Sequence, residues 1–118
     1  MKPCVFNYTE TFIKSFDMVI DHLLFYNNQN SQVIEQAEQA IIKVKQTIEQ
    51  HPQAYPLNQD IIEYGLIYHE ANIPRSNNGF SVLYSINETV DGDQINFELF
   101  LLQKMSVQKA LSQFLLLQ

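Results

Sequence analysis

The sequence predicts an α+β domain in which a two-helix antiparallel hairpin packs on an antiparallel sheet. Two observations support this prediction. Apolar residues recur at helical spacing along two segments in the first half of the chain, and they alternate with polar residues in the second half. The 118 residues, 46% of them hydrophobic, match a single domain that spans residues 1–118 and encloses one core.

The first expected elements are an N-terminal edge strand over residues 5–8 and a helix that follows it directly. Thr9 can cap this helix, and Glu10 suits the positive end of the helix dipole. The helix is expected to end near Tyr26. Its apolar residues keep to one face: Phe12, Phe16, Val19, Ile20, Leu23 and Leu24.

A second helix is expected after a tight connection at residues 27–30. Asn30 or Ser31 can cap it, and His51 followed by Pro52 ends it. Because the connection is so short, the two helices should lie antiparallel. The apolar stripe of the second helix is Val33, Ala37, Ile41, Val44 and Ile48.

Three strands in an antiparallel meander should follow an extended loop at residues 52–58. The first is expected over residues 66–71, and turns are expected at residues 75–79 and 90–93. The apolar residues that alternate with polar ones in the last two strands are Phe80, Val82, Tyr84 and Ile86, then Ile95, Phe97, Leu99 and Leu101. In the last strand this alternation with Asn96 and Glu98 gives way to a pattern that is apolar on both faces. A short C-terminal helix capped by Ser106 is expected over residues 106–115.

Charge makes the middle of the chain a poor surface for nucleic acid. The whole chain carries a formal charge of −6. Residues 52–103 hold a single cation, Arg75, against seven acidic residues: Asp60, Glu63, Glu70, Glu88, Asp91, Asp93 and Glu98. Since contacts to phosphates need clustered Lys and Arg, direct nucleic-acid binding is not expected.

Cysteine content and hydropathy favour a cytoplasmic protein. Cys4 is the single cysteine, so no intrachain disulfide can form, and a buried role is favoured over a reactive thiol. The N-terminus lacks the apolar stretch of a signal peptide, and no apolar run is long enough to span a bilayer. Neither secretion nor a membrane partner is therefore expected.

Each of the three histidines has an ordinary structural reading besides a catalytic one. His22 lies within the first helix, and His51 lies at the end of the second, where a cation is favourable. Tyr68, His69 and Glu70 cannot act together from one strand, because adjacent side chains point to opposite faces. No metal-ligand motif, glycine-rich phosphate loop or nucleophile elbow occurs, so no metal and no cofactor is expected.

In element order and in several local strings, the chain resembles the RelE/ParE superfamily of bacterial toxins from type II toxin-antitoxin modules, which include plasmid stabilization systems. The strings are Thr-Glu-Thr-Phe-Ile-Lys-Ser-Phe at 9–16, an Ala-rich second helix, His-Pro-x-x-x-Pro at 51–56, and Phe-Ser-Val-Leu-Tyr-Ser-Ile at 80–86. The resemblance covers nearly the whole chain and implies the family's fold.

The chain departs from the family at residues that its ribonucleases use. Many members place an arginine on the central strand where this chain has Ser81, and a His or Tyr near the C-terminus is missing. Arg75, Tyr84 and Lys104 are the remaining candidate catalytic residues. For each of them a structural or surface role is the plainer reading.

The ParE-like branch of the family fits the absence of these ribonuclease residues better. Resemblance to that branch implies a toxin that binds DNA gyrase and needs no hydrolytic site. A cognate antitoxin, whose disordered tail folds over the helical hairpin and the sheet, would neutralise it. Two alternatives stay open: an endoribonuclease that cuts messenger RNA on the ribosome, and an inactive interaction module. Whether the chain forms a homo-oligomer also stays open.

Overall fold

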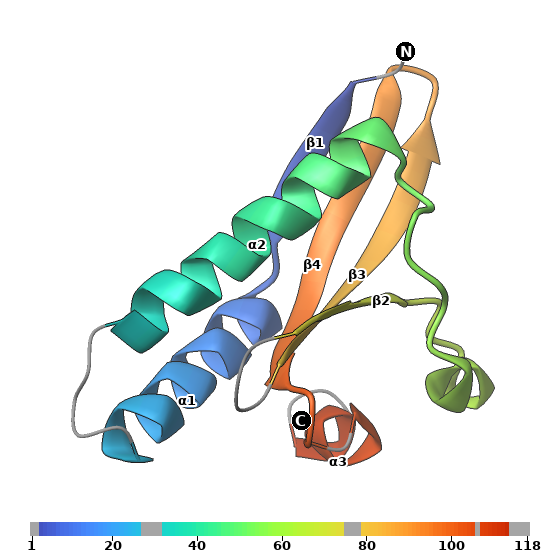
Figure 1. Cartoon of the computed structure of the whole chain (residues 1–118). Helices are drawn as coiled ribbons and strands as arrows, with labels where there is room; N and C mark the ends of the chain where they lie inside the picture. Colours follow the sequence, from blue (N-terminus) through green and yellow to red (C-terminus); the bar gives the residue numbers. More distant parts are fainter. Residues whose placement is uncertain (1–2, 27–31, 75–78, 106, 114–118) are drawn as a thin grey trace.

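The computed structural model describes residues 3–26, 32–74, 79–105 and 107–113. Its elements are β1 (Cys4–Tyr8), α1 (Glu10–Tyr26), α2 (Gln32–Gln50), the 3-10 helix η1 (Gln59–Tyr64), β2 (His69–Ile73), β3 (Phe80–Thr89), β4 (Gly92–Leu102) and α3 (Val107–Leu111). The expected α+β class is confirmed, whereas η1 was not expected. Four strands form one mixed sheet in the order β1-β4-β3-β2, with β1 parallel to β4 and the other neighbours antiparallel (Figure 1).

The start of α1 is capped and attached to the sheet by the same residue. The Thr9 hydroxyl accepts a hydrogen bond from the Phe12 N–H at 3.0 Å, which confirms the expected cap. The hydroxyl and the N–H of Thr9 also donate to the Phe97 carbonyl at 3.0 and 3.1 Å. The strand therefore passes into the helix at a fixed point on β4.

The two long helices cover one face of the sheet, which we call the helix face. Figure 1 shows α2 running back alongside α1, as expected for the hairpin. The expected apolar stripes of both helices pack here against seven buried residues of β3 and β4. These are Phe80, Val82, Tyr84, Ile95, Phe97, Phe100 and Leu102.

The edge of β4 is completed first by β1 and then by α1. β1 pairs with residues 93–97 of β4 and ends at Tyr8. Farther along, the buried Ser15 hydroxyl of α1 accepts a hydrogen bond from the Phe100 N–H at 2.9 Å and donates to the Phe12 carbonyl. Ser15 thus satisfies a strand N–H that β1 does not reach.

Among the described residues, η1 and α3 cover part of the opposite face of the sheet. Leu83, Leu99 and Leu101 from the strands pack there with Ile61 of η1, Ala110 of α3 and Tyr68. On the rest of this face, β1, β3 and β4 carry a group of polar side chains that we call the polar strip. Its members are Asn7, Ser85, Asn87, Gln94, Asn96 and Glu98.

A β-bulge in β4 overturns part of the expected alternation. Leu83 pairs with Leu99, whereas the next residue, Tyr84, pairs with Phe97, so Glu98 is an extra residue in β4. As a result Ile95 and Phe97 lie on the helix face, but Leu99 and Leu101 lie on the opposite face. The expected alternation therefore ends at Phe97, and beyond it β4 buries apolar side chains on both faces.

The first strand of the second half begins three residues later than expected. Gly65, at a left-handed φ of 80°, closes η1. The chain then runs back along the loop at residues 52–58, where the Tyr68 carbonyl accepts from the Asn58 N–H at 2.9 Å. β2 consequently covers His69–Ile73, and the expected strand at residues 66–71 was wrong at its start.

Some expectations fall outside the described residues. These are the connection and caps at residues 27–31, the turn from Arg75 to Asn78, the Ser106 cap and the end of the closing helix beyond residue 113. Within the described part, α2 ends at Gln50, directly before His51 and Pro52, as expected. The turn between Thr89 and Gly92 also lies where the sequence predicted it.

Candidate functional site

Tyr84, one of the three candidate catalytic residues, is a core residue. Its side chain is fully buried, and its hydroxyl donates to the Pro52 carbonyl at 2.9 Å. Burial raises the pKa of the phenol, so it stays protonated at neutral pH. The hydroxyl ties β3 to the loop after α2, and a role in packing accounts for this residue.

Lys104 lies away from Tyr84, beyond the end of β4. It is exposed and lines a small pocket of about 160 Å³ between α1 and the end of β4, together with Met18, Val19, His22, Leu102 and Met105. Arg75 lies outside the described residues. The structure therefore does not bring Tyr84 and Lys104 together into one site.

The buried histidine, His69, has a structural environment. Its ring stacks on that of Tyr84 at 5.0 Å between centroids, and its Nδ1 lies 2.6 Å from the Tyr55 carbonyl oxygen. The Tyr68 side chain packs on the face of the sheet opposite the helices, whereas His69 stacks on Tyr84 on the helix face. Tyr68 and His69 therefore point to opposite faces, as the sequence predicted. His22 lies 4.7 Å from the Tyr26 ring, and His51 is exposed beyond α2.

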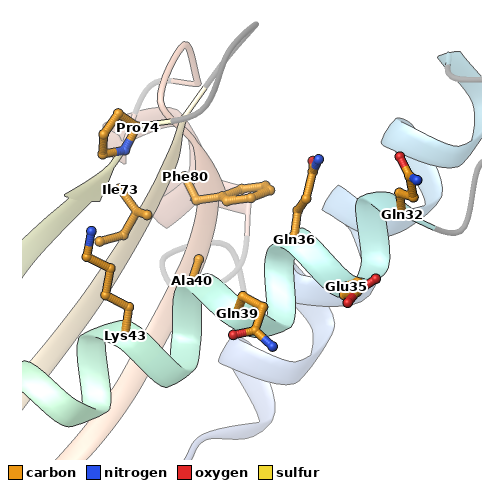
Figure 2. A pocket seen from close by; sticks show the side chains of 9 residues that line it. All are labelled: Gln32, Glu35, Gln36, Gln39, Ala40, Lys43, Ile73, Pro74 and Phe80. Atoms are coloured by element: carbon orange, nitrogen blue, oxygen red, sulfur yellow. The ribbon is translucent and has the colours of Figure 1, made fainter.

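A groove of about 470 Å³ lies between α2 and the ends of β2 and β3. Figure 2 shows the Phe80 ring reaching from β3 toward α2, beside Ala40. Both residues are buried and form the apolar floor. The other lining residues are Gln32, Glu35, Gln36, Gln39 and Lys43 from α2, with Ile73 and Pro74.

A second groove, of about 330 Å³, lies between the start of α1 and the middle of α2. Apart from Glu38 its lining is apolar and aromatic: Tyr8, Phe12, Ile13, Phe16, Ile41 and Ile42. Ile13 and Ile42 are 51% and 44% exposed, which is unusual for isoleucine. The two grooves flank the exposed side of α2.

The polar strip holds a carboxylate that sequence reasoning did not single out. Glu98 accepts a hydrogen bond from the Ser85 hydroxyl at 2.8 Å. Burial raises the pKa of this carboxyl group, and the hydrogen bond from Ser85 partly opposes that shift. Burial, and secondarily the Glu98 charge, raises the pKa of Tyr68 to about 12. The sequence signal for this site was the isolated acid within the apolar end of β4.

Metal and thiol chemistry find no support in the described residues. No group of three or more His, Cys, Asp or Glu lies close enough within them to hold a metal ion. Cys4 is half-buried, and its burial, followed by the nearby Asp93 and Glu49, raises the pKa of the thiol. The protonated thiol is a poor nucleophile.

Comparison with known proteins found no matching family model, no matching curated protein and no matching solved structure. Across the part of the chain that the structure describes, no helix has the length and apolarity needed to cross a membrane.

Proposed function

We propose that this chain is the toxin of a type II toxin-antitoxin module of the RelE/ParE kind. It would arrest growth by binding a protein, and DNA gyrase is the first target to test. A cognate antitoxin would neutralise it. The observation that carries the proposal is the strand-helix-helix-strand-strand-strand-helix order on a sheet with β1 beside β4. It supports the local sequence resemblance described above and a meander of β2, β3 and β4.

The placement of charges favours binding over RNA cleavage. Cleavage by this family type requires cations at the transferring phosphate and a base at the ribose hydroxyl. Where it is described, the sheet surface opposite the helices carries the Glu70 and Glu98 carboxylates with amide and hydroxyl side chains, and no Lys or Arg lies on the strands. This surface would repel a phosphate, whereas binding a protein does not require cations there.

The grooves on either side of α2 suit the antitoxin. An amphipathic segment of the antitoxin would place apolar side chains against Ile13 and Ile42 in one groove and against Phe80 in the other. Glu35, Gln39 and Lys43 would lie at the rim, where polar side chains of the antitoxin meet them. A tail that is disordered alone can order as it covers these surfaces.

The proposal is tested by inducing the chain in bacteria and following growth, the DNA damage response and the 5′ ends of messenger RNA. We expect arrest with a DNA damage response and intact messages. Arrest with cleaved messages would establish the endoribonuclease alternative, and normal growth would show an inactive module.

The neutralising partner is tested by co-expressing the reading frame next to this one, when it encodes a small protein with a polar tail. Rescue of growth is expected. Ile42→Glu should leave arrest intact but prevent rescue, since it puts a charge into the apolar groove. Gln46→Glu, also exposed on α2, is the matched control and should still be rescued.

A further inference from the structure

The small pocket between α1 and the end of β4 is lined by both methionines that the structure describes, Met18 and Met105. Methionine is among the side chains most often buried, but Met18 is 42% exposed. His22, from the same helix as Met18, lines the pocket as well. A volume of about 160 Å³ thus brings together two thioethers and one imidazole from distant parts of the chain.

Two ordered parts of the backbone carry these three side chains. Met18 and His22 are four residues apart on α1, so they are neighbours on one face of the helix. Met105 lies in the turn after β4, where its N–H donates to the Leu102 carbonyl at 2.9 Å. The flexible thioether side chains can therefore turn their sulfur atoms toward one ion without a change in the backbone.

The donor atoms of this cluster are little used by the rest of the described chain. The Met18 sulfur accepts one weak hydrogen bond, from the Gln113 Nε2 atom at 3.9 Å. The His22 ring contacts that of Tyr26, at 4.7 Å between centroids, and neither ring nitrogen bonds to a described residue. An imidazole nitrogen and the sulfur atoms are therefore available as ligands.

We propose that Met18, His22 and Met105 form a binding site for a copper(I) ion. Thioethers select soft ions such as Cu(I), and imidazole also suits copper, so Cu(I) is the ion that both ligand types favour. Zn²⁺ is bound by thiolate, imidazole and carboxylate groups, and Ca²⁺ and Mg²⁺ by oxygen atoms. The absence of His, Cys, Asp and Glu clusters in the described residues does not bear on this site, because methionine is not among those ligands.

The surroundings of the pocket suit a weakly hydrated cation. Val19 and Leu102 add apolar side chains to the lining, and an apolar shell limits the access of water to a metal. Lys104 also lines the pocket, but it is exposed, and its long stem lets the ammonium group extend into water. Copper binding here does not depend on the proposed toxin function.

The first measurement adds Ag⁺, which shares the soft ligand preference of Cu(I), to the full chain while NMR follows isotope-labelled methionine methyl groups. We expect the Met18 and Met105 signals to shift together, and Zn²⁺ should leave both unshifted. The affinity for Cu(I) is then measured without oxygen, by competition with bathocuproine disulfonate. Met18→Leu, Met105→Leu and His22→Gln should each lower this affinity at least about tenfold, since losing even an outer-shell partner of a metal costs that much.

Cys4→Ser and His51→Gln are the matched controls. Cys4 is the single thiol of the chain and the competing soft ligand, and His51 is an exposed histidine that does not line the pocket. Both variants should keep the Cu(I) affinity and the methyl shifts, and circular dichroism checks that every variant is folded.

Three results would overturn the proposal. They are loss of Cu(I) binding in Cys4→Ser, an unchanged affinity in Met18→Leu and His22→Gln, and equal methyl shifts with Zn²⁺. Because Met→Leu nearly conserves the side-chain volume, both methionine variants should fold, so loss of binding in them reports on the sulfur atoms. Lys104→Gln removes a positive charge from the lining and should strengthen Cu(I) binding.

Discussion

The helix face and the polar strip lie on opposite faces of the same sheet and differ in how their side chains contact one another. On the helix face, large side chains interlock: the Phe97 ring lies 5.2 Å from that of Tyr8 and 5.6 Å from that of Phe12. On the polar strip, amides and a carboxylate stand beside one another with few bonds between them. The first surface holds the fold together, whereas the second contributes few side-chain contacts to it.

The bulge at Glu98 changes which residues of β4 face the helices. Before the bulge these residues are Ile95 and Phe97, and after it they are Phe100 and Leu102. The strand therefore buries apolar residues on both faces near its end, where η1 and α3 cover the opposite face. The comparison of the two surfaces leads to four predictions.

The largest expected effect is on the helix face. Phe97→Ala should lower the free energy of unfolding by about 3–5 kcal/mol, because it removes the ring that several aromatic side chains contact. Asn87→Ala on the polar strip should change it by less than about 0.5 kcal/mol. Urea unfolding followed by circular dichroism measures both, and equal losses would contradict the contrast between the surfaces.

The next effect tests how α1 completes the edge of β4. Ser15→Ala should cost about 1–3 kcal/mol in unfolding free energy, because the buried Phe100 N–H then has no acceptor. Hydrogen exchange should become faster at the Phe100 amide. If the Phe100 amide exchanges at the same rate in Ser15→Ala as in the unchanged chain, the Ser15 hydroxyl does not accept a hydrogen bond from it.

A smaller effect is expected at Tyr84. Tyr84→Phe removes the hydrogen bond to the Pro52 carbonyl and should cost about 1 kcal/mol in unfolding free energy. If the chain arrests growth as proposed, Tyr84→Phe should leave that arrest unchanged, because the hydroxyl bonds to the Pro52 carbonyl and packs in the core. Loss of arrest in a variant that still folds would restore Tyr84 as a catalytic residue.

The smallest effect concerns Glu98 and depends on pH. Its folded pKa is raised, so the folded state holds this proton more tightly than the unfolded state, and stability falls as the pH rises through that pKa. Glu98→Gln should therefore stabilise the chain at neutral pH, and the difference should disappear in acid. Thermal unfolding of both chains across the pH range measures this, and a difference independent of pH would show that Glu98 has no raised pKa.

Sequence patterns predicted the helices and the class of the fold well. The apolar residues from Phe12 to Leu24 lie on one side of α1, and those from Val33 to Ile48 lie on one side of α2. The Thr9 cap fixes the start of α1, and α2 ends directly before His51. These features depend on neighbours within one or two turns, which a single sequence displays.

The rest depends on residues far apart in the chain. The run from Phe97 to Leu102 is apolar at five of six positions, so nothing in it marks where the bulge reverses the alternation. η1 forms on the Asn58 cap and is held by packing of Ile61 against distant strands. Ser85 and Glu98 come within hydrogen-bond distance only because β3 pairs with β4 across the bulge, so sequence reasoning missed this contact.

The most direct test of the central claim, that this chain arrests growth by binding a protein, compares the unchanged chain with the double variant Arg75→Ala and Lys104→Ala after induction in bacteria. These substitutions remove the two cations that an RNA-cleaving mechanism would have used. We predict the same arrest from both chains, with a DNA damage response and uncut messenger RNA. Normal growth of the folded double variant, beside messenger RNA cleaved by the unchanged chain, would contradict the account.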